Sequence, residues 1–113
     1  MKATPLKRNL KAFTLEHRHN IELAVSKVYN VTIEQINSVT RKRHICDARK
    51  LVWKLIEDIH RISRTDIGRM YRVSYTVPHA DHSTIFHGIS AIEDLIETDE
   101  DTRIKYNLVK EML

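Results

Sequence analysis

Three histidines, an aspartate and two small hydroxyl residues stand close together in the stretch PHADHSTIFHG, residues 78–88. Such side chains can ligate a metal, exchange protons with a substrate, or hydrogen-bond to a binding partner. A zinc site needs three or four converging ligands, yet the sequence holds no H-E-x-x-H motif, and Cys46 is its sole cysteine. His82 and His87 are five positions apart, which places them on different faces of a helix. The stretch therefore favours contact with a partner over a metal site.

Catalytic chemistry has no better support elsewhere in the sequence. The histidine-rich stretch has no second carboxylate close in sequence, and nothing near His44 and Cys46 identifies an oxyanion site for a nucleophile pair. The phosphate-binding motif G-x-x-x-x-G-K-[ST] is also absent. We therefore expect no enzyme or ATPase activity, no metal and no cofactor.

The composition bounds the fold class. A chain of 113 residues is one domain by length, and two glycines and two prolines leave little material for hairpins, so an all-α fold is expected. Apolar stretches are short and interrupted by charge, and the first residues lack the apolar core of a signal peptide. The sequence thus predicts a cytoplasmic protein without a membrane segment.

Charge is distributed unevenly along the chain. Six of the fifteen acidic residues fall between Glu93 and Asp101, a segment without any Lys or Arg, while the rest of the chain carries nineteen basic residues. This division indicates a basic surface for a polyanion and a separate acidic patch.

Periodicity and capping residues divide the chain into helices. Thr32 with Gln35, and Ser63 with Asp66, have the spacing of helix N-terminal caps, and residues 72–80 break the pattern and predict a loop. The apolar positions expected to mark the helices are Leu6, Leu10 and Phe13; Ile21, Ala24, Val25 and Val28; Leu51, Val52, Leu55, Ile56, Ile59 and Ile62; Ile85, Ile89, Ile92 and Ile96; and Ile104, Leu108 and Met112.

Two successive helices have the outline of a helix-turn-helix. The first is short and contains Gly68, and the second begins near Asp81 with polar residues. In that motif the first residues of the second helix meet base edges in the major groove, so His82, Ser83 and Thr84 would contact the bases. Equally, these residues could only satisfy the free N–H groups at the start of the helix.

The octet Asp81-His82-Ser83-Thr84-Ile85-Phe86-His87-Gly88 resembles the D-H-T-T-V-L-H-A signature of the C-terminal DNA-binding domain of the bacterial replication initiator DnaA. Further motifs resemble that domain in the same order along residues 20–113. They are Val25-Ser26-Lys27-Val28-Tyr29-Asn30-Val31, Ser38-Val39-Thr40-Arg41-Lys42-Arg43, Ala48-Arg49-Lys50, Asp66-Ile67-Gly68 and Ile92-Glu93-Asp94-Leu95. The agreement of several separate motifs makes the resemblance specific.

The resemblance implies a compact, Trp-repressor-like helix-turn-helix domain over residues 20–113, preceded by an extension or linker helix over residues 1–19. It also implies a set of DNA contacts, in which an arginine matching Arg41 enters an A·T-rich minor groove and the residue matching His87 lies near the backbone. The implied DNA-binding residues are Arg41, Lys42 and Arg43 of the basic loop, Arg49 and Lys50 on phosphates, and Asp81, His82, Ser83, Thr84 and His87 of the second helix.

Several positions depart from the family pattern. The family joins the two helices by a short Gly-Gly-Arg turn, whereas here the join runs over residues 72–80, with Arg72 and His79 as candidate extra contacts. Asp47, Gly88 and Ala91 also differ from the family residues. Because each change that loses a positive charge removes a phosphate contact, we expect weakened or altered DNA binding.

The function implied is sequence-specific binding of double-stranded DNA at DnaA-box-like sites, in a replication origin or regulatory region of the nucleoid. The alternative is a protein-binding adaptor or transcriptional regulator that keeps the fold with weakened DNA specificity. A replication initiator or another replication protein is then a candidate partner, and the oligomeric state stays open.

Overall fold

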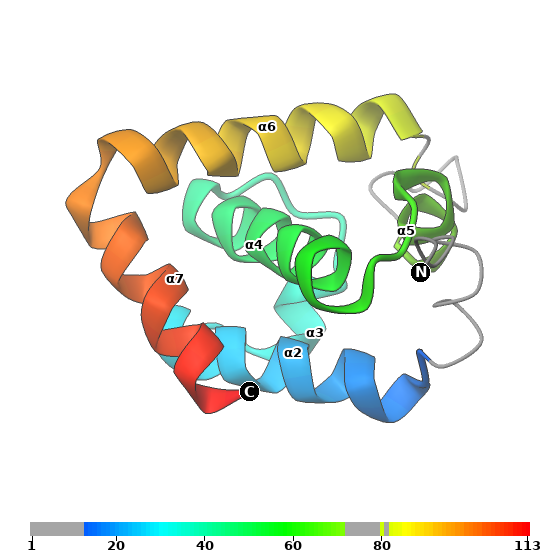
Figure 1. Cartoon of the computed structure of the whole chain (residues 1–113), viewed down its shortest axis with the longest axis horizontal. Coiled ribbons are helices and arrows are strands. Elements are labelled where there is room, and N and C mark those ends of the chain that lie inside the picture. The colour runs from blue at the N-terminus through cyan, green and yellow to red at the C-terminus, as the bar shows by residue number, and fades with distance from the viewer. Residues whose placement is uncertain (1–12, 72–79, 81) are drawn as a thin grey trace, which may run out of the picture.

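The computed structural model of the chain describes residues 13–71, 80 and 82–113, and over these residues it contains six helices and no strand (Figure 1). In chain order they are α2 (Leu15–Tyr29), α3 (Ile33–Ile36), α4 (Arg43–His60), α5 (Arg64–Met70), α6 (His82–Thr98) and α7 (Glu100–Met112). The all-α fold expected from the composition is confirmed. Of the helix expected around Leu6, Leu10 and Phe13, only Phe13 is described, and it precedes α2 outside any helix; Asp81 also lies outside the described residues.

The central element is α4, which packs against α2, α3, α5 and α6. Figure 1 shows it between α6 on one side and α2 on the other. Of the apolar positions expected to line it, Leu51, Val52, Leu55 and Ile56 are completely buried, and so is Ile62, which lies beyond the end of α4 at His60. The sixth, Ile59, is 45% exposed, because it lies in the last turn of α4 and lines an open groove beside α2 and the end of α7.

Helix starts follow the capping pattern of the sequence. Thr32 and Gln35 form the expected capping box at the start of α3, and the Ser63 hydroxyl accepts a hydrogen bond from the Asp66 amide at the start of α5. Thr14 caps α2 in the same way, with His17 completing a capping box. A side-chain oxygen at these positions satisfies an amide that has no partner inside the helix.

The orientation of α7 differs from the apolar pattern in its sequence. Ile104, Leu108 and Met112 are each about half exposed, at 51%, 47% and 49%, whereas Thr102 and Val109 are buried. One residue step turns a helix by about 100°, so burying Val109 instead of Leu108 rotates the apolar stripe toward solvent. The face of α7 that packs on α2 and α6 is therefore narrower than the apolar stripe of Ile104, Leu108 and Met112 predicts.

A buried carboxylate ties three parts of the domain together. Glu22 of α2 is 4% exposed, accepts a hydrogen bond from the Tyr71 hydroxyl at 2.5 Å, and forms a 3.0 Å ion pair with Arg18. It also accepts a hydrogen bond from the Asn37 side chain just after α3. Because Arg18, Asn37 and Tyr71 all hydrogen-bond to this carboxylate, it can stay buried. The bond to Tyr71 also fixes the position of the chain where it leaves α5.

Among the described residues, no helix has the length and apolar content needed to cross a lipid bilayer.

Candidate nucleic-acid interface

A groove lies between the N-terminal half of α6, the first turns of α4 and the loop before α4. Its volume is about 540 Å³. Five residues expected to contact DNA line it, namely Arg41, Arg49, Lys50, Thr84 and His87. The remaining wall is formed by Val39, Thr40, Cys46, Trp53, Gly88 and Ala91. Parts of the sequence that are more than forty residues apart thus meet at one surface.

The basic loop is exposed and continues directly into α4. Arg41, Lys42 and Arg43 are all exposed, and Arg43 is already the first residue of the helix. Lys42, at the N-cap, makes no capping hydrogen bond through its side chain, and the first turn contains no acidic residue. Unpaired amides, the positive end of the helix dipole and three cationic side chains therefore coincide, which favours a bound anion.

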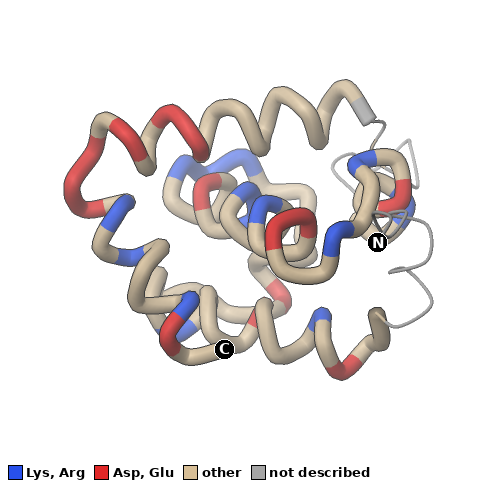
Figure 2. The backbone as a smooth tube through the Cα atoms, viewed as in Figure 1, with Lys and Arg blue, Asp and Glu red and all other residues tan. Residues whose placement is uncertain are grey.

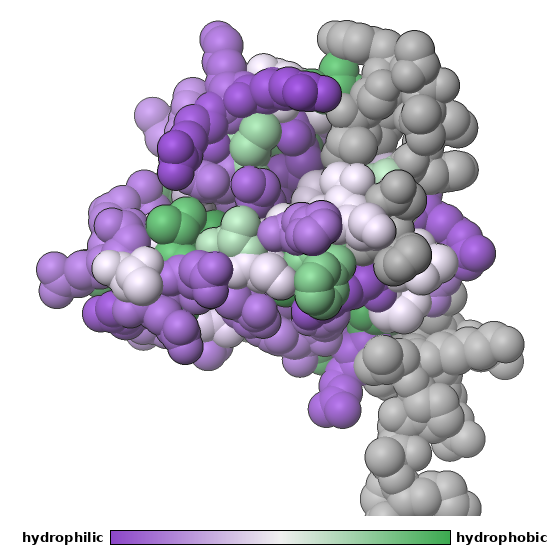
Figure 3. Space-filling model, turned by 90° about the horizontal axis from the view of Figure 1, so that it is seen from above, coloured by the Kyte–Doolittle hydropathy of each residue, from purple (hydrophilic) through white to green (hydrophobic). Residues whose placement is uncertain are grey.

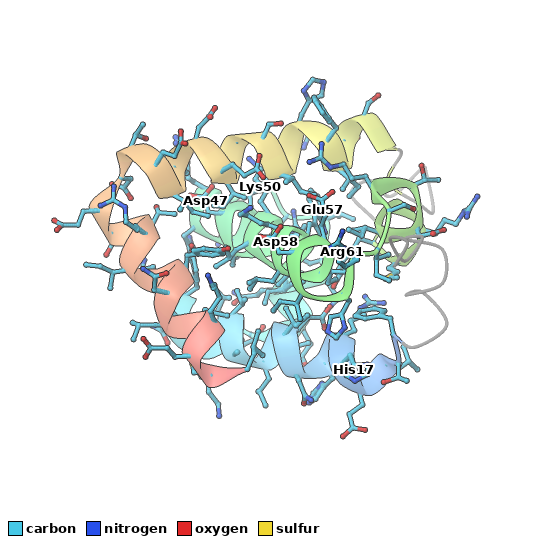
Figure 4. All side chains as sticks on the ribbon, in the orientation of Figure 1. His17, Asp47, Lys50, Glu57, Asp58 and Arg61 are labelled. Atoms are coloured by element: carbon cyan, nitrogen blue, oxygen red, sulfur yellow. The ribbon has the colours of Figure 1, made fainter. Side chains whose placement is uncertain are left out.

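Lys50 lies about two helical turns after Arg43, on the side of α4 that faces α6. Figure 4 shows it close to Asp47 and between the two helices. Over the residues that the structure describes, the cations that form no ion pair include Arg41, Lys42, Arg43 and Lys50. These charges are available for a polyanion.

The first turns of α6 present small polar side chains. Ser83 and His87 are exposed, and Thr84 is half-buried on the side of the groove. The His87 ring packs edge-on against Phe86, with 5.6 Å between the ring centroids. His82 opens the helix, although its side chain lies outside the described residues, as does Asp81. The exposed edge of α6 is hydrophilic apart from Phe86, and Figure 3 shows a mostly hydrophilic surface on this side of the molecule.

Two residues that the sequence analysis did not assign to packing hold α6 against α4. Trp53 is 3% exposed and lines the groove, and its ring lies directly under Gly88. Interior glycine in a helix is unfavourable unless close approach requires it, which is the signal that could have predicted this contact. The departure at Gly88 is thus explained by helix packing.

The surroundings of Arg49 differ from those of the other basic residues of the groove. Its side chain is 5% exposed, and its guanidinium donates hydrogen bonds to backbone carbonyls of residues 35–40. Although it lines the groove, its donors already have acceptors inside the protein. A direct phosphate contact, as the family resemblance implies, would compete with these bonds.

The join between α5 and α6 is closed at its base. The Ala80 amide donates to the carbonyl oxygens of Tyr71 at 2.8 Å and Gly68 at 2.9 Å, and Ala80 is buried. Arg72 and His79, the candidate extra contacts, lie outside the described residues. The described ends of the longer join therefore meet as the ends of a tight turn do.

Acidic residues gather at the far end of α6 and the start of α7 (Figure 2). Hydrogen bonds from the hydroxyl and amide of Thr102 lower the pKa of Asp99, the N-cap of α7. The Lys54 ammonium group on α4 lies 3.0 Å from a carboxylate oxygen of Asp58 and 3.1 Å from one of Glu93. Glu93, an acidic residue of α6, is therefore paired with a cation on α4. The most exposed acidic side chains are thus separated along α6 from the groove.

Histidines also meet elsewhere. The rings of His17 and His60 lie 4.8 Å apart, beside Phe13 and a second groove between α2, α4 and α7; His17 is labelled in Figure 4. Burial and the neighbouring His17 lower the pKa of His60. In the described part of the chain, no group of three or more His, Cys, Asp or Glu side chains could hold a metal ion.

Comparisons with known proteins agree with this geometry. The family described as the bacterial dnaA protein helix-turn-helix matches residues 19–92. The chain is 28% identical over 108 residues to the chromosomal replication initiator protein DnaA of Rickettsia canadensis (strain McKiel), and 29% identical to that of Rickettsia bellii (strain OSU 85-389). Each match covers 96% of this chain but 21% of the relative, so the chain spans about a fifth of their length. Taken with the groove and the two helices that border the closed join, the match shows that this chain belongs to the bacterial DnaA helix-turn-helix family.

Proposed function

We propose that this domain binds double-stranded DNA with the first turns of α6 in the major groove and the basic loop against the neighbouring minor groove. The observation that carries the proposal is the groove, because it brings Arg41, Lys50, Thr84 and His87 to one surface although they come from distant parts of the sequence. A second helix with exposed polar residues at its start is the element that a helix-turn-helix inserts into DNA.

The polar groups proposed to contact DNA each suit one part of a duplex. Ser83 and Thr84 donate to or accept from base edges, and the Thr84 methyl group can rest against a thymine methyl. His87, beside them, can donate to a guanine N7 or a phosphate. His82 and Asp81 complete the expected set on sequence grounds. These residues would provide specificity.

The cations would provide affinity. Arg41 is proposed to enter an A·T-rich minor groove, where a narrow groove concentrates negative potential, and Lys42, Arg43 and Lys50 to contact phosphates. Four cations that each displace a counterion give a log–log slope of affinity against salt of about −3 to −4.

The expected site is a DnaA-box-like sequence in an origin or regulatory region, bound without ATP hydrolysis. A second candidate function, protein binding by an adaptor or transcriptional regulator, draws support from the exposed apolar stripe of Ile104, Leu108 and Met112 on α7. A replication initiator would be the partner to test first.

Fluorescence anisotropy tests the DNA proposal. Labelled duplexes of equal length, one with a DnaA box and one with the same bases scrambled, are titrated with the intact chain across a salt series. Tighter binding of the box that persists as salt rises supports base recognition. Equal binding of both duplexes that disappears with salt contradicts it and favours the adaptor function.

A further inference from the structure

Arg49 makes a dense set of backbone contacts from the second turn of α4. Its Nε donates to the Ile36 carbonyl at 2.9 Å, and Nη2 donates to the Ser38 carbonyl at 2.8 Å. Longer contacts reach the carbonyls of Gln35 at 3.4 Å and Thr40 at 3.3 Å. A guanidinium has five donors and no acceptor, so few of its donors are left for an outside partner.

These acceptors come from the end of α3 and the loop that follows it. A helix of a single turn leaves its last carbonyls without partners in the helix, and a cation is favourable at that end of the helix dipole. Arg49 supplies both donors and charge. The Cys46 thiol also approaches the Thr40 carbonyl, at 3.6 Å.

The chain position of these carbonyls matters for DNA binding. Thr40 directly precedes Arg41, so the guanidinium holds the backbone one residue before the proposed minor-groove side chain. Lys42 makes no side-chain cap that could fix the loop from the other end. Short-range hydrogen bonds within the loop and the Cys46 thiol also restrain residues 38–40, but in the described part of the chain only Arg49 joins both Ser38 and Thr40 to α4.

We propose that Arg49 is a positioning residue, which shapes the basic loop and acts on DNA only through Arg41. The proposal rests on the proposed DNA binding. It differs from the phosphate contact that the family resemblance implies for this arginine. A guanidinium bound to a phosphate would give up hydrogen bonds to backbone carbonyls, of which the bond to Ile36 is buried.

A double-mutant cycle separates the two roles. Arg49→Lys keeps the charge but cannot bridge four carbonyls, since an ammonium group is a compact donor on a flexible stem. We expect Arg49→Lys and Arg41→Ala each to weaken binding of an A·T-flanked duplex about tenfold, and the double variant to bind no worse than either single variant. A phosphate ligand predicts instead that Arg49→Lys retains most binding and that Arg41→Ala costs the same tenfold in both backgrounds, which would overturn the proposal.

Lys50→Met is the matched control, because Lys50 is the next residue of α4, lines the same groove and, among the described residues, forms no hydrogen bond to the loop. Its effect should add to that of Arg41→Ala and should lower the salt slope by about one.

Hydrogen exchange of the free protein tests the loop without DNA. Arg49→Lys and Arg49→Met should speed amide exchange in peptides covering residues 35–42 and leave peptides from the central part of α6 unchanged. Unchanged exchange in the loop would overturn the proposal, and so would global unfolding of both variants, because the arginine would then support the core. If the wild-type chain binds no duplex, the proposed function fails, while this measurement still decides the role of Arg49 in the loop.

Discussion

Gly88 on α6 and Trp53 on α4 are in such close contact that a β-carbon at position 88 would fall 2.6 Å from the indole Cζ3. A second ring atom would lie at 2.9 Å, and the indole is buried, so the ring has little room to move away. The absence of a β-carbon at Gly88 thus lets α6, the proposed recognition helix, approach α4 closely at this point.

Gly88→Ala should therefore destabilise the domain by about 1 to 3 kcal/mol, although alanine is the better helix former. Urea unfolding followed by circular dichroism measures the loss. Trp53→Phe removes the larger ring and loses no hydrogen bond, since the indole Nε1 has no partner among the described groups. In the Trp53→Phe background Gly88→Ala should cost less, and an equal cost in both backgrounds would exclude the contact as its cause.

Replacement of residues 72–79 by Gly-Gly should preserve the fold. Tyr71 and Ala80 would become the first and fourth residues of a β-turn, which carries the carbonyl-to-amide hydrogen bond that they already form. Shortening a loop fourfold also lowers its closure cost by about 1 kcal/mol. Thermal melting should show an equal or higher midpoint; a lower midpoint would mean that the segment stabilises the domain. Any change in DNA affinity of the shortened chain then measures what the segment contributes.

Tyr71→Phe should cost about 1 to 3 kcal/mol near neutral pH, because it removes a hydrogen bond to the buried Glu22 carboxylate. Burial, followed by the nearby Glu22 charge, raises the pKa of Tyr71 well above its ordinary value. As the pH rises, Tyr71 therefore loses its proton at a lower pH in the unfolded chain than in the folded one. The stabilisation by the protonated Tyr71 is complete below about pH 10 and is lost as the pH rises further.

The free energy of unfolding of wild type should thus fall more steeply above about pH 10 than that of Tyr71→Phe. Tyr106→Phe is a useful comparison, since burial also raises the pKa of this less buried tyrosine. Parallel curves for wild type and Tyr71→Phe would show that Tyr71 does not titrate differently in the two states.

His60 should make the domain sensitive to acid. Burial, and then the nearby His17, lower the pKa of His60, so the folded state favours the neutral ring. The neutral His60 ring therefore contributes to the free energy of unfolding above about pH 6.5, the pKa of histidine in an unfolded chain. This contribution is lost as the pH falls through the lower pKa of His60 in the folded state. His60→Gln should flatten the pH dependence of the melting midpoint in that range, and an unchanged dependence would contradict the assignment.

Thr84→Ala and Lys50→Ala should affect DNA binding in different ways. We expect Thr84→Ala to cost about 1 to 3 kcal/mol on the preferred duplex and little on a scrambled one, as for a base contact. His82→Ala should behave as Thr84→Ala does. Lys50→Ala should weaken both duplexes alike. Anisotropy titrations of each variant on both duplexes decide this, and equal losses on both duplexes for Thr84→Ala would remove it from the base-contacting set.

Local patterns in the sequence predicted local structure well. Thr32 and Ser63 cap the expected helices because a cap depends on residues three positions away. The all-α class and the family were likewise predicted from composition and from motifs of a few residues. The burial of Ile59 and of the stripe Ile104, Leu108 and Met112 was predicted wrongly, because the pattern within one helix does not show which of its residues the neighbouring helices cover.

The candidate site was predictable in part. Its polar residues follow from the family motifs, whereas the proximity of Trp53 to Gly88 joins residues far apart in sequence and leaves no periodic signal. The surroundings of Arg49 were hidden for a similar reason, since its acceptors are backbone carbonyls that no residue type reveals. The DNA contacts themselves stay predictions.

The acidic end of α6 has a consequence for how quickly DNA would be found. A molecule with exposed cations beside one end of a helix and carboxylates at the other experiences a torque near a polyanion. Collisions that lead with Glu97 or Asp101 would be repelled, and the molecule would turn before contact. Neutralising these exposed acids should then change the association rate constant and its dependence on ionic strength more than the dissociation rate constant.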